Sequence, residues 1–330
     1  MAMTTNAQNT FAQVGIREDL ADIVYRITPE DTPFQSNIST AGTATSRYVE
    51  WQVQTLATPS TSNFQLEGAE TTASAVTARQ RLGNRTAISS KTFAVTTTAR
   101  AVDVAGIDDE YDQQQLLAGL ELKNDMEVIL LNNQAQTTGG TTTVVKCAGL
   151  ATFITNTDNT GTDRFTAATG DGTDAWNFSA STVRALSLTI LNGALKDAYV
   201  DGGKPDFVML SPAQKKNFSG LAFATGSGAA QVRQSISKNE AATIVGSVES
   251  WLSDFGTLAV SVNTQMSSDA SFLDITAFMI DSKFAEVAFL EPMQNRPHGI
   301  TGLSDEEDVF ANYTLKVGAP KAHAFVSNLS

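Results

Sequence analysis

One stretch, residues 106–140, constrains the fold most, because it holds no proline and a single internal glycine, Gly119. Such a sequence predicts a helix over about 107–138, roughly 45 Å long at 1.5 Å per residue. Acidic residues occupy its first turn, where they suit the positive end of the helix dipole. The pair Gly139-Gly140 is a typical helix stop. We therefore expect the rest of the chain to be arranged around one long helix.

The apolar residues of this helix fall on two sides at about 100° per residue. One side carries Ile107, Tyr111, Leu122, Met126, Ile129 and Leu130, and the other carries Leu117, Leu120, Val128 and Leu131. A helix that is apolar on two sides must be covered on two sides. The pattern fits an ordinary core helix. It also fits a spine that lies between its own sheet and something else, such as a neighbouring subunit.

A long, poorly supported hairpin is predicted before the helix. Residues 47–56 alternate, with Val49, Trp51 and Val53 facing one way, as in a half-exposed strand. The predicted partner strand is 88–98. The intervening residues are rich in Thr, Ser, Ala and Gln and too polar to form a core. Because an isolated hairpin of this size is not stable in water, it needs another surface to lie on.

The charges of this segment contrast with those of the whole chain. The formal net charge is −13, yet residues 71–102 contain no acid and five basic residues: Arg79, Arg81, Arg85, Lys91 and Arg100. Two acidic runs complement them: Asp108, Asp109 and Glu110 at the helix start, and Asp305, Glu306, Glu307 and Asp308. The basic segment is either a solvated loop or one half of a pairing, within the chain or between copies. The acidic balance argues against a specific nucleic-acid-binding face.

The N-terminal region is predicted to be an arm. Ile16, Leu20, Ile23 and Val24 have helical spacing, which predicts a short helix near 17–26. Pro29 and Pro33 then make an extended segment in which Phe34 is a candidate anchor. The arm packs either on its own domain or on a neighbour.

The remaining chain predicts a compact α/β region followed by strands. We expect a strand at 141–147, a helix capped by Ser179 or Ser181 and running to about Tyr199, a buried strand at 207–210, and a helix opened by Ser211-Pro212. Further strands are expected at 244–251, 257–262, 275–280, 286–290, 313–317 and 322–326.

No catalytic or metal-binding signature stands out. There are two histidines, His298 and His323, and one cysteine, Cys147, without zinc-type spacing, a nucleophile elbow or a phosphate-binding loop. A lone buried cysteine is expected to be inert. No apolar run approaches the 18 residues of a membrane span, and residues 1–15 lack the basic start and apolar segment of a signal peptide. We expect no enzyme activity, cofactor or metal.

Framework motifs then point to a family. They are GIREDLAD at 15–22 followed by YRITPEDTPF at 25–34, SDFG at 253–256, and YTLKV at 313–317 with KAHA at 321–324. Together they resemble the major capsid (major head) proteins of tailed bacteriophages of the SU10-like group, a branch of the HK97-fold family. The resemblance covers most of the chain and is weakest across 141–250.

The resemblance implies an α+β, HK97-like fold with named parts. These are an N-terminal arm (1–46), an extended β-hairpin called the E-loop (47–102), a peripheral domain (103–147 and 251–330, with the long helix as its spine) and an axial domain (148–250). In that family the E-loop lies over a neighbouring subunit, which is the support that the hairpin needs. The inter-subunit contacts expected are Phe34, Arg79, Arg81, Arg85, Asp108, Asp109, Glu110, Asp305, Glu306 and Glu307.

The implied function is a structural one. The chain is expected to self-assemble in the host cytoplasm into hexamers and pentamers of an icosahedral virion head around double-stranded DNA, which it contacts non-specifically. Its other expected partners are a portal protein, a separate scaffolding protein and a decoration protein, with no membrane. Scaffolding is expected to be separate because the head-protein pattern starts near residue 11, and no Lys–Asn pair suggests covalent cross-links.

Three other functions compete with this one. An encapsulin-like compartment would share the fold, and the contents of the particle, DNA or a cargo enzyme, would tell the two apart. An α/β enzyme without a recognisable motif would be monomeric or dimeric and would hold a metal or cofactor. A tail or surface β-protein fits the Thr/Ser richness but not the long helix.

Overall fold

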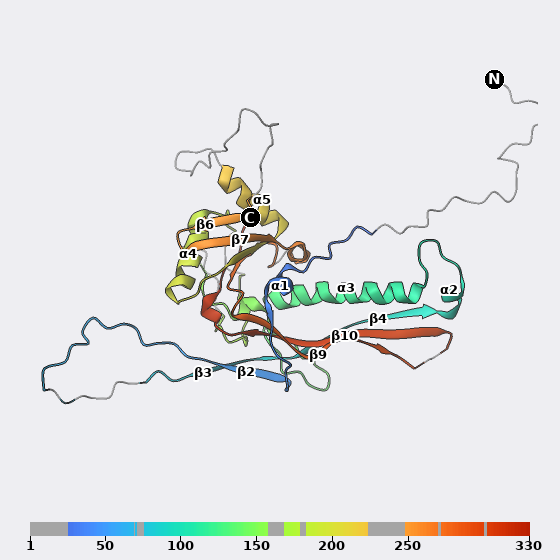
Figure 1. Ribbon diagram of the computed structural model, residues 1–330, viewed down its shortest axis with the longest axis horizontal. Coiled ribbons are helices and arrows are strands. Elements are labelled where there is room, and N and C mark those ends of the chain that lie inside the picture. Colours follow the sequence, from blue (N-terminus) through green and yellow to red (C-terminus); the bar gives the residue numbers. More distant parts are fainter. Residues whose placement is uncertain are drawn as a thin grey trace, which may run out of the picture.

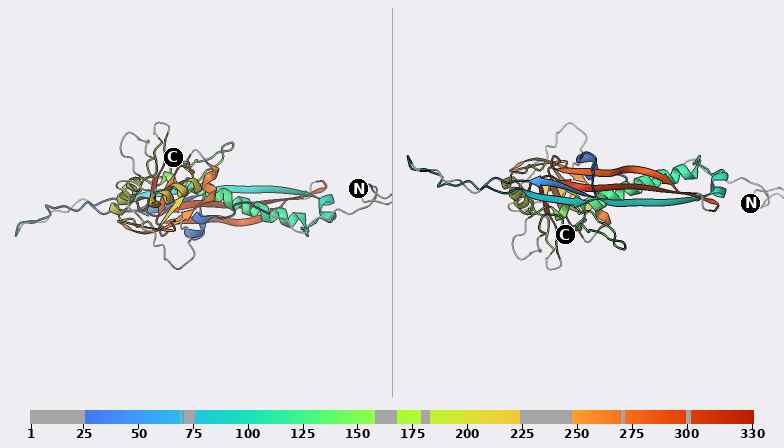
Figure 2. Two further views of the ribbon diagram at one scale, coloured as in Figure 1. Left: turned by 90° about the horizontal axis from the view of Figure 1, so that it is seen from above. Right: turned by 90° about the horizontal axis from the view of Figure 1, so that it is seen from below.

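The polypeptide is elongated, with a compact unit on one side and a long, narrow layer of helix and strands beneath it (Figure 1). This computed structural model describes residues 26–68, 70, 76–157, 168–178, 183–223, 248–269, 272–299 and 302–330. The hairpin loop leaves one end of the body, and the short helix α2 (Thr97–Ala101) lies at the other (Figure 2). Residues near 60 and residues near 100 are therefore at opposite ends of the subunit.

The long helix is α3, Glu110–Leu131, with 22 residues. It is shorter at both ends than the predicted 107–138. It begins after Asp109, whose carboxylate accepts a hydrogen bond from the Tyr111 amide (2.9 Å) and so acts as the N-cap. The acidic start is thus partly a capping device.

The predicted end of this helix at Gly139-Gly140 is wrong. The helix stops at Asn132, whose Oδ1 accepts a hydrogen bond from the Asn133 amide (2.7 Å). Asparagine side chains compete in this way with helical hydrogen bonds. Tertiary packing reinforces the stop, because Gly149 approaches so closely that a Cβ there would lie 1.9 Å from the Asn132 carbonyl oxygen.

The helix lies on the four-stranded sheet β1-β9-β10-β4. We call α3 and the strands β4 (Ala87–Thr96), β9 (Ala285–Pro297) and β10 (Ser304–Val317) the blade. The short strand β1 (Ser39–Thr40) pairs parallel with β9, and the other pairs are antiparallel. One apolar side of α3 is therefore covered by its own sheet.

The second side of α3 is covered only in part. Of the four apolar residues on this side, Leu131 is buried near the C-terminal end, where the 3₁₀ helix η2 (Thr264–Ser268) and the N-terminal segment pack against α3. Leu117, Leu120 and Val128 are only partly buried. The chain's own arm thus supplies part of the cover that the two-sided pattern required.

The predicted hairpin exists, but with a different second strand. β2 (Tyr48–Val53) pairs antiparallel with β3 (Gln80–Arg85), whereas the predicted partner segment is β4, which pairs with β10. β3 continues into β4 with only Thr86 between them. The excursion from the body is therefore shorter than the expected 47–102, because residues 87–101 belong to the blade and α2.

A second sheet, in the order β11-β8-β5-β7-β6, builds the compact unit, which we call the upper unit. Its strands are β5 (Phe207–Leu210), β6 (Ser250–Ser253), β7 (Gly256–Val262), β8 (Ala277–Ile280) and β11 (Ala324–Val326). The helix α4 (Leu188–Val200) packs on β11, and α5 (Pro212–Phe223) follows β5. The expected domain boundary at 250 does not match this sheet, since β6, β7, β8 and β11 lie beyond it.

Local capping signals explain both helices of the upper unit. Ser211 Oγ accepts a hydrogen bond from the Gln214 amide (3.2 Å), which confirms the predicted Ser-Pro start of α5. α4 begins later than predicted, because Ser187 rather than Ser179 or Ser181 is its N-cap. It ends at Val200, close to the predicted Tyr199, and a left-handed glycine, Gly202 (φ +92°), follows.

Several other predicted elements differ or lie outside the described residues. The strand predicted at 141–147 is an irregular segment with one antiparallel bridge, between Thr137 and Lys146. Short helices not predicted are α1 (Pro33–Asn37), η1 (Leu150–Thr152) and η3 (Pro320–Ala322). The helix predicted near 17–26 lies outside the described residues, except for its last residue.

Candidate assembly surfaces

The loop of the hairpin presents large apolar side chains to water. Leu56 is 96% exposed, Phe64 86%, Leu66 82% and Val76 89%. Exposed apolar side chains grouped on one segment mark a surface that contacts another protein. This loop extends away from the body (Figure 1), so the described part of its own subunit leaves these side chains in water.

The three hairpin arginines lie at the paired base of this loop. Arg81 forms an ion pair with Glu50 across the strands (3.2 Å), and Arg79 donates to Gln52 (3.2 Å). The guanidinium of Arg85 lies 5.0 Å from the centre of the Tyr48 ring. These contacts hold the side chains along the hairpin. They leave charge exposed, since the Arg81 side chain is 72% accessible to solvent.

A buried asparagine fixes the base of the hairpin to the body. Asn84 Nδ2 donates to the carbonyls of Ala148 (3.1 Å) and Leu315 (2.8 Å), and its Oδ1 accepts from the amides of Ala148 (2.8 Å) and Arg85 (2.8 Å). Asn84 is fully buried, so these four bonds satisfy its amide completely. They join β3 to β10 and to the segment after α3, which sets the direction in which the hairpin leaves the body.

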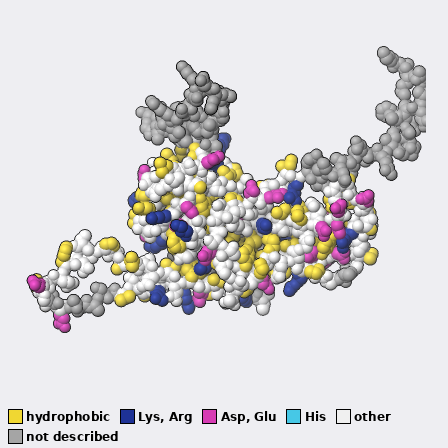
Figure 3. Space-filling model, viewed as in Figure 1, with side chains coloured by type: hydrophobic (Ala, Val, Ile, Leu, Met, Phe, Trp, Pro, Cys, Tyr) yellow, Lys and Arg dark blue, Asp and Glu magenta, His cyan; other side chains and the backbone are white. Residues whose placement is uncertain are grey.

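The opposite end of the subunit carries the acidic surface (Figure 3). Here Arg100 binds Asp109 at 2.7 Å and Asp305 at 2.8 Å, and its guanidinium lies 4.9 Å from the centre of the Tyr111 ring. The pKa of Asp109 is lowered, chiefly by the hydrogen bond from Arg100. Two predicted contact residues, Asp109 and Asp305, are therefore joined within one subunit by an arginine of the basic segment.

The acidic run on β10 is also partly neutralised by its own subunit. Glu307 is buried and accepts hydrogen bonds from Gln115 Nε2 (3.3 and 3.4 Å). Asp308 accepts from Thr92 Oγ1 (2.5 Å) and lies 2.7 Å from His298 Nε2, and these contacts lower its pKa. Glu306 lies further from the same imidazole, at 3.8 Å.

Of the remaining predicted acids, Asp108 is exposed, and Glu110 accepts a hydrogen bond from Gln114 (2.6 Å). Another basic residue of the segment, Lys91, pairs with Asp125 on α3 at 2.8 Å. Part of the basic segment thus pairs within the chain, through Lys91 and Arg100. The three hairpin arginines do not reach the acidic end of their own subunit.

The ion pairs of the acidic end predict a decline of stability in acid. Folding lowers the pKa of Asp109 and Asp308 below their ordinary value of 3.8, so their stabilisation is present above that value and is lost as the pH falls through the folded pKa. We expect the free energy of unfolding of the unassembled subunit, measured with urea from pH 6 to 3, to fall more steeply in the wild type than in Asp109→Asn/Asp308→Asn. Asparagine preserves the helix cap and the Thr92 bond. Equal acid slopes would contradict this assignment.

Phe34 lies in the core of its own subunit. It belongs to α1, is fully buried and packs in the core cluster that includes residues of α3. Phe34 was predicted to contact another subunit, but in this structure its side chain is buried within its own subunit. The alternative that the arm packs on its own domain applies to residues 26–38.

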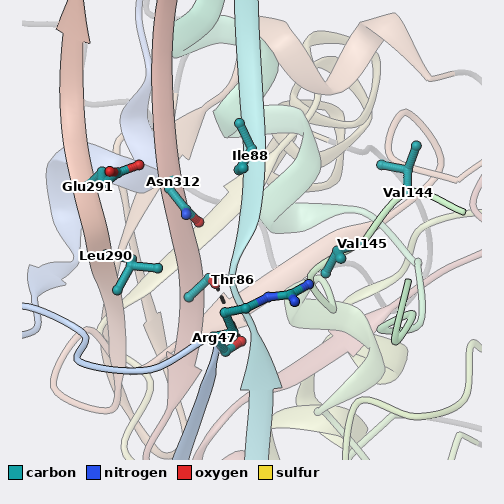
Figure 4. Close-up of a pocket in the computed structure, with 8 residues that line it drawn as sticks. All are labelled: Arg47, Thr86, Ile88, Val144, Val145, Leu290, Glu291 and Asn312. Carbon is teal, nitrogen blue, oxygen red and sulfur yellow. Dashed lines mark hydrogen bonds between the residues drawn. The ribbon is translucent and has the colours of Figure 1, made fainter. Parts of the chain in front are cut away.

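A hollow of about 530 Å³ lies beside the hairpin base (Figure 4). It is lined by Arg47, Thr86, Ile88, Val144, Val145, Leu290, Glu291 and Asn312. The Asn312 Oδ1 atom is buried without a hydrogen-bond partner, and Ile88 is 65% exposed. This lining offers apolar contacts and an open acceptor, and it brings together no nucleophile with an adjacent base.

The residues first considered for chemistry are buried or structural. Cys147 is fully buried, and burial raises the pKa of its thiol to about 12. His323 is also fully buried, and burial lowers its pKa to about 4. In the described ranges, no three His, Cys, Asp or Glu side chains are grouped to hold a metal ion. No helix of the described chain has the length and apolar content needed to cross a bilayer.

Two structurally important residues were missed in the sequence: Asn84 and the buried Glu127 of α3. For Glu127 a signal existed, because a lone acid within the apolar run Met126–Leu131 is unusual on a core helix. Asn84 is a polar residue inside a strand, and no local sequence pattern indicates that it fixes the hairpin base to the body.

Comparison with solved structures shows that the fold matches that of phage capsid chains. A chain from Gordonia phage Cozz has a TM-score of 0.61 at 12% identity, covering 97% of this chain and 92% of that one. A chain from Mycobacterium phage Bobi gives 0.60 at 11%, covering 96% of each. A chain from the asymmetric unit of the bacteriophage PhiM1 mature capsid gives 0.54 at 10%, covering 98% and 95%. Among curated proteins, no sequence matches.

The family follows from the sequence itself. The profile of the SU10 major capsid protein family matches residues 3–330, nearly the whole chain. The protein therefore belongs to the SU10 major capsid protein family. Its role is structural, as a subunit of the phage capsid, and the predicted α+β fold is confirmed.

Proposed function

We propose that this chain assembles as hexamers and pentamers into an icosahedral head that encloses double-stranded DNA. The observation that carries the proposal is the hairpin loop, whose four large apolar side chains are 82–96% exposed in the isolated subunit. A shell subunit needs such a surface, because neighbouring copies bury it on assembly. The family match favours a phage head over an encapsulin-like compartment and implies a non-enzymatic role.

The described elements support an HK97-type division of labour. The hairpin of β2 and β3 with residues 54–79 corresponds to the E-loop, α3 to the spine helix and the blade to the peripheral domain. The upper unit corresponds to the axial domain around the centre of each capsomer. In this proposal the E-loop is the segment 48–85, rather than 47–102.

The proposed contact between copies is electrostatic as well as apolar. Arg79, Arg81 and Arg85 lie at the hairpin base, and the exposed Asp108 lies at the far end of the body. Opposite charges at opposite ends suit a head-to-tail contact, which closes into rings when the rotation between copies allows it. Such contacts determine register and partner choice more than affinity.

The other proposed partners follow from the capsid role. Assembly takes place in the host cytoplasm with a separate scaffolding protein, a portal occupies one vertex, and a decoration protein binds the outer surface. Contact with DNA is weak and non-specific, in keeping with the net charge of −13. The shell is held by non-covalent contacts.

Removing the loop tests the proposal. Replacing residues 54–79 by Asn-Gly joins the paired residues Val53 and Gln80 through a two-residue turn. We expect a folded subunit with unchanged circular dichroism that forms no particles in sedimentation, under conditions where the wild type does.

A second variant keeps the loop length and changes Leu56, Phe64, Leu66 and Val76 to serine. It is also expected to reduce particle yield at least tenfold, because the apolar side chains are the proposed contact. Normal particles from both variants would contradict the proposed docking of the loop on a neighbour.

A further inference from the structure

Glu127 is a fully buried carboxylate in the C-terminal half of α3. Its Oε1 accepts hydrogen bonds from the Phe34 amide (2.6 Å) and from Asn263 Nδ2 (2.8 Å). Its Oε2 accepts from the amide (3.1 Å) and the side-chain Nε2 (3.1 Å) of Gln35. Four donors thus converge on one side chain from two other parts of the chain.

The N-terminal segment depends on this carboxylate for its helix cap. Thr32, the N-cap residue of α1, makes no side-chain capping bond, and Pro33 has no amide hydrogen. The next two amides, of Phe34 and Gln35, are the donors that a cap normally satisfies. Glu127 satisfies both from another helix.

The other donor comes from the upper unit. Asn263 directly follows β7, and its Oδ1 accepts a hydrogen bond from the Gln265 amide (2.9 Å). This bond fixes the orientation of the asparagine amide, so that its NH₂ group faces Glu127. One carboxylate therefore links α3, the N-terminal segment and the upper unit.

Among the residues that the structure describes, no cation lies against this buried carboxylate. The charged residues within two turns on α3 are Glu121, Lys123 and Asp125, those on residues 26–37 are Arg26, Glu30 and Asp31, and all six are exposed. Arg26 and Glu30 pair with each other at 2.7 Å. α1, η2 and β5 carry no charged residue. Within the described part of the chain the carboxylate is held by neutral donors, which offset only part of the cost of burying it.

The rest of the attachment is slight. Within residues 26–37, Phe34 is the only buried side chain. The Pro29 carbonyl accepts from Asn124 Nδ2 (3.2 Å) and Gln265 Nε2 (3.0 Å), and Gln35 Nε2 also donates to the Lys123 carbonyl (2.9 Å). Burial of the Phe34 ring and the hydrogen bonds to Glu127 favour attachment, and only the desolvation of the carboxylate opposes it.

We propose that residues 26–37 form a releasable strap on α3 and that Glu127 is its latch. Release returns the carboxylate to water and frees Asn263, so the strap and the junction between α3 and the upper unit open together. The strap opens while the blade stays folded. This inference does not depend on the assembly proposal, because it concerns the isolated subunit.

Hydrogen exchange of the unassembled full-length subunit tests the latch. In Glu127→Ala, the protection of the Phe34 and Gln35 amides is expected to fall at least tenfold, while that of β10 changes less than twofold. The matched control is Glu121→Ala on the same helix, whose carboxylate is 62% exposed and lies 3.8 Å from Lys91. It is expected to leave the strap unchanged. Unchanged protection in Glu127→Ala, or equal loss over strap and β10, would overturn the proposal.

A pH series separates the latch from a merely structural role. Burial raises the pKa of Glu127 above its ordinary 4.5, so the closed strap binds the proton more tightly than the open one. The closed state is then favoured at low pH and loosens as pH rises. The opening constant should increase by up to about tenfold per pH unit between 4.5 and the folded pKa, and then level off. Glu127→Gln, which does not titrate, should show no such rise. An equal rise in this variant would refute the role of Glu127.

Discussion

A subunit carrying Arg79→Glu, Arg81→Glu and Arg85→Glu is expected to fold normally and to form no shells. Folding tolerates the change because the partners of these arginines are exposed cross-strand contacts, such as the Arg81–Glu50 pair at 3.2 Å. Assembly does not tolerate it, because the hairpin base would then repel the acidic far end of a neighbouring copy. We expect particle yield to fall at least a hundredfold.

Sedimentation and circular dichroism measure the two outcomes separately. A matched control, Lys196→Glu, Lys204→Glu and Lys283→Glu, makes the same change of net charge at exposed positions away from the hairpin. It is expected to assemble. Normal shells from the hairpin variant would show that the basic segment does not dock on a neighbour, and loss of shells in both variants would assign the effect to net charge alone.

The second large effect is expected at Asn84. Asn84→Ala leaves the amide and carbonyl of Ala148 and the carbonyl of Leu315 without their present partner inside the protein. Because each buried, unsatisfied group costs about 1–3 kcal/mol, we expect the free energy of unfolding to fall by about 3–5 kcal/mol.

Urea denaturation of the unassembled subunit measures this loss. The control is Asn37→Ala, which removes one exposed, local hydrogen bond, from Nδ2 to the Pro33 carbonyl (2.7 Å). It is expected to change stability by less than about 0.5 kcal/mol. A loss at Asn84 no larger than that at Asn37 would mean that the hairpin base is not held by this side chain.

Local signals predicted much of the architecture. The alternation in residues 47–56 gave β2, the Ser211-Pro212 pair gave the start of α5, and the apolar run at 207–210 gave a fully buried strand. The long helix was expected from its lack of proline and its acidic start. These features depend on neighbours in sequence, which a single chain displays directly.

The errors involve tertiary contacts. Residues 88–98 were predicted to pair with β2, but they pair with β10, more than 200 residues away in the sequence. The pattern of side chains along a strand does not show which other strand it pairs with. The helix was expected to reach Gly139, but packing of Gly149 against Asn132 ends it earlier. The periodicity of residues 107–131 indicated that both sides of α3 need cover, but it did not show which parts of the protein provide that cover.

For the candidate contact residues, too, the sequence showed the local charge pattern but not the tertiary contacts. The sequence correctly marked an acidic end and a basic segment, yet it did not show that Arg100 joins Asp109 and Asp305 within one subunit. It nominated Phe34 as an anchor, and the ring is indeed fully buried, in its own core. Whether Arg79, Arg81 and Arg85 meet a second copy depends on the assembled shell, which a single subunit does not contain.

Negative-stain electron microscopy of the purified wild-type chain, expressed with the scaffolding protein, shows whether the subunit builds a capsid. We expect closed shells of uniform size built from ring-shaped capsomers. A stable 35.0 kDa monomer that forms no rings and no shells under any assembly condition would contradict this expectation.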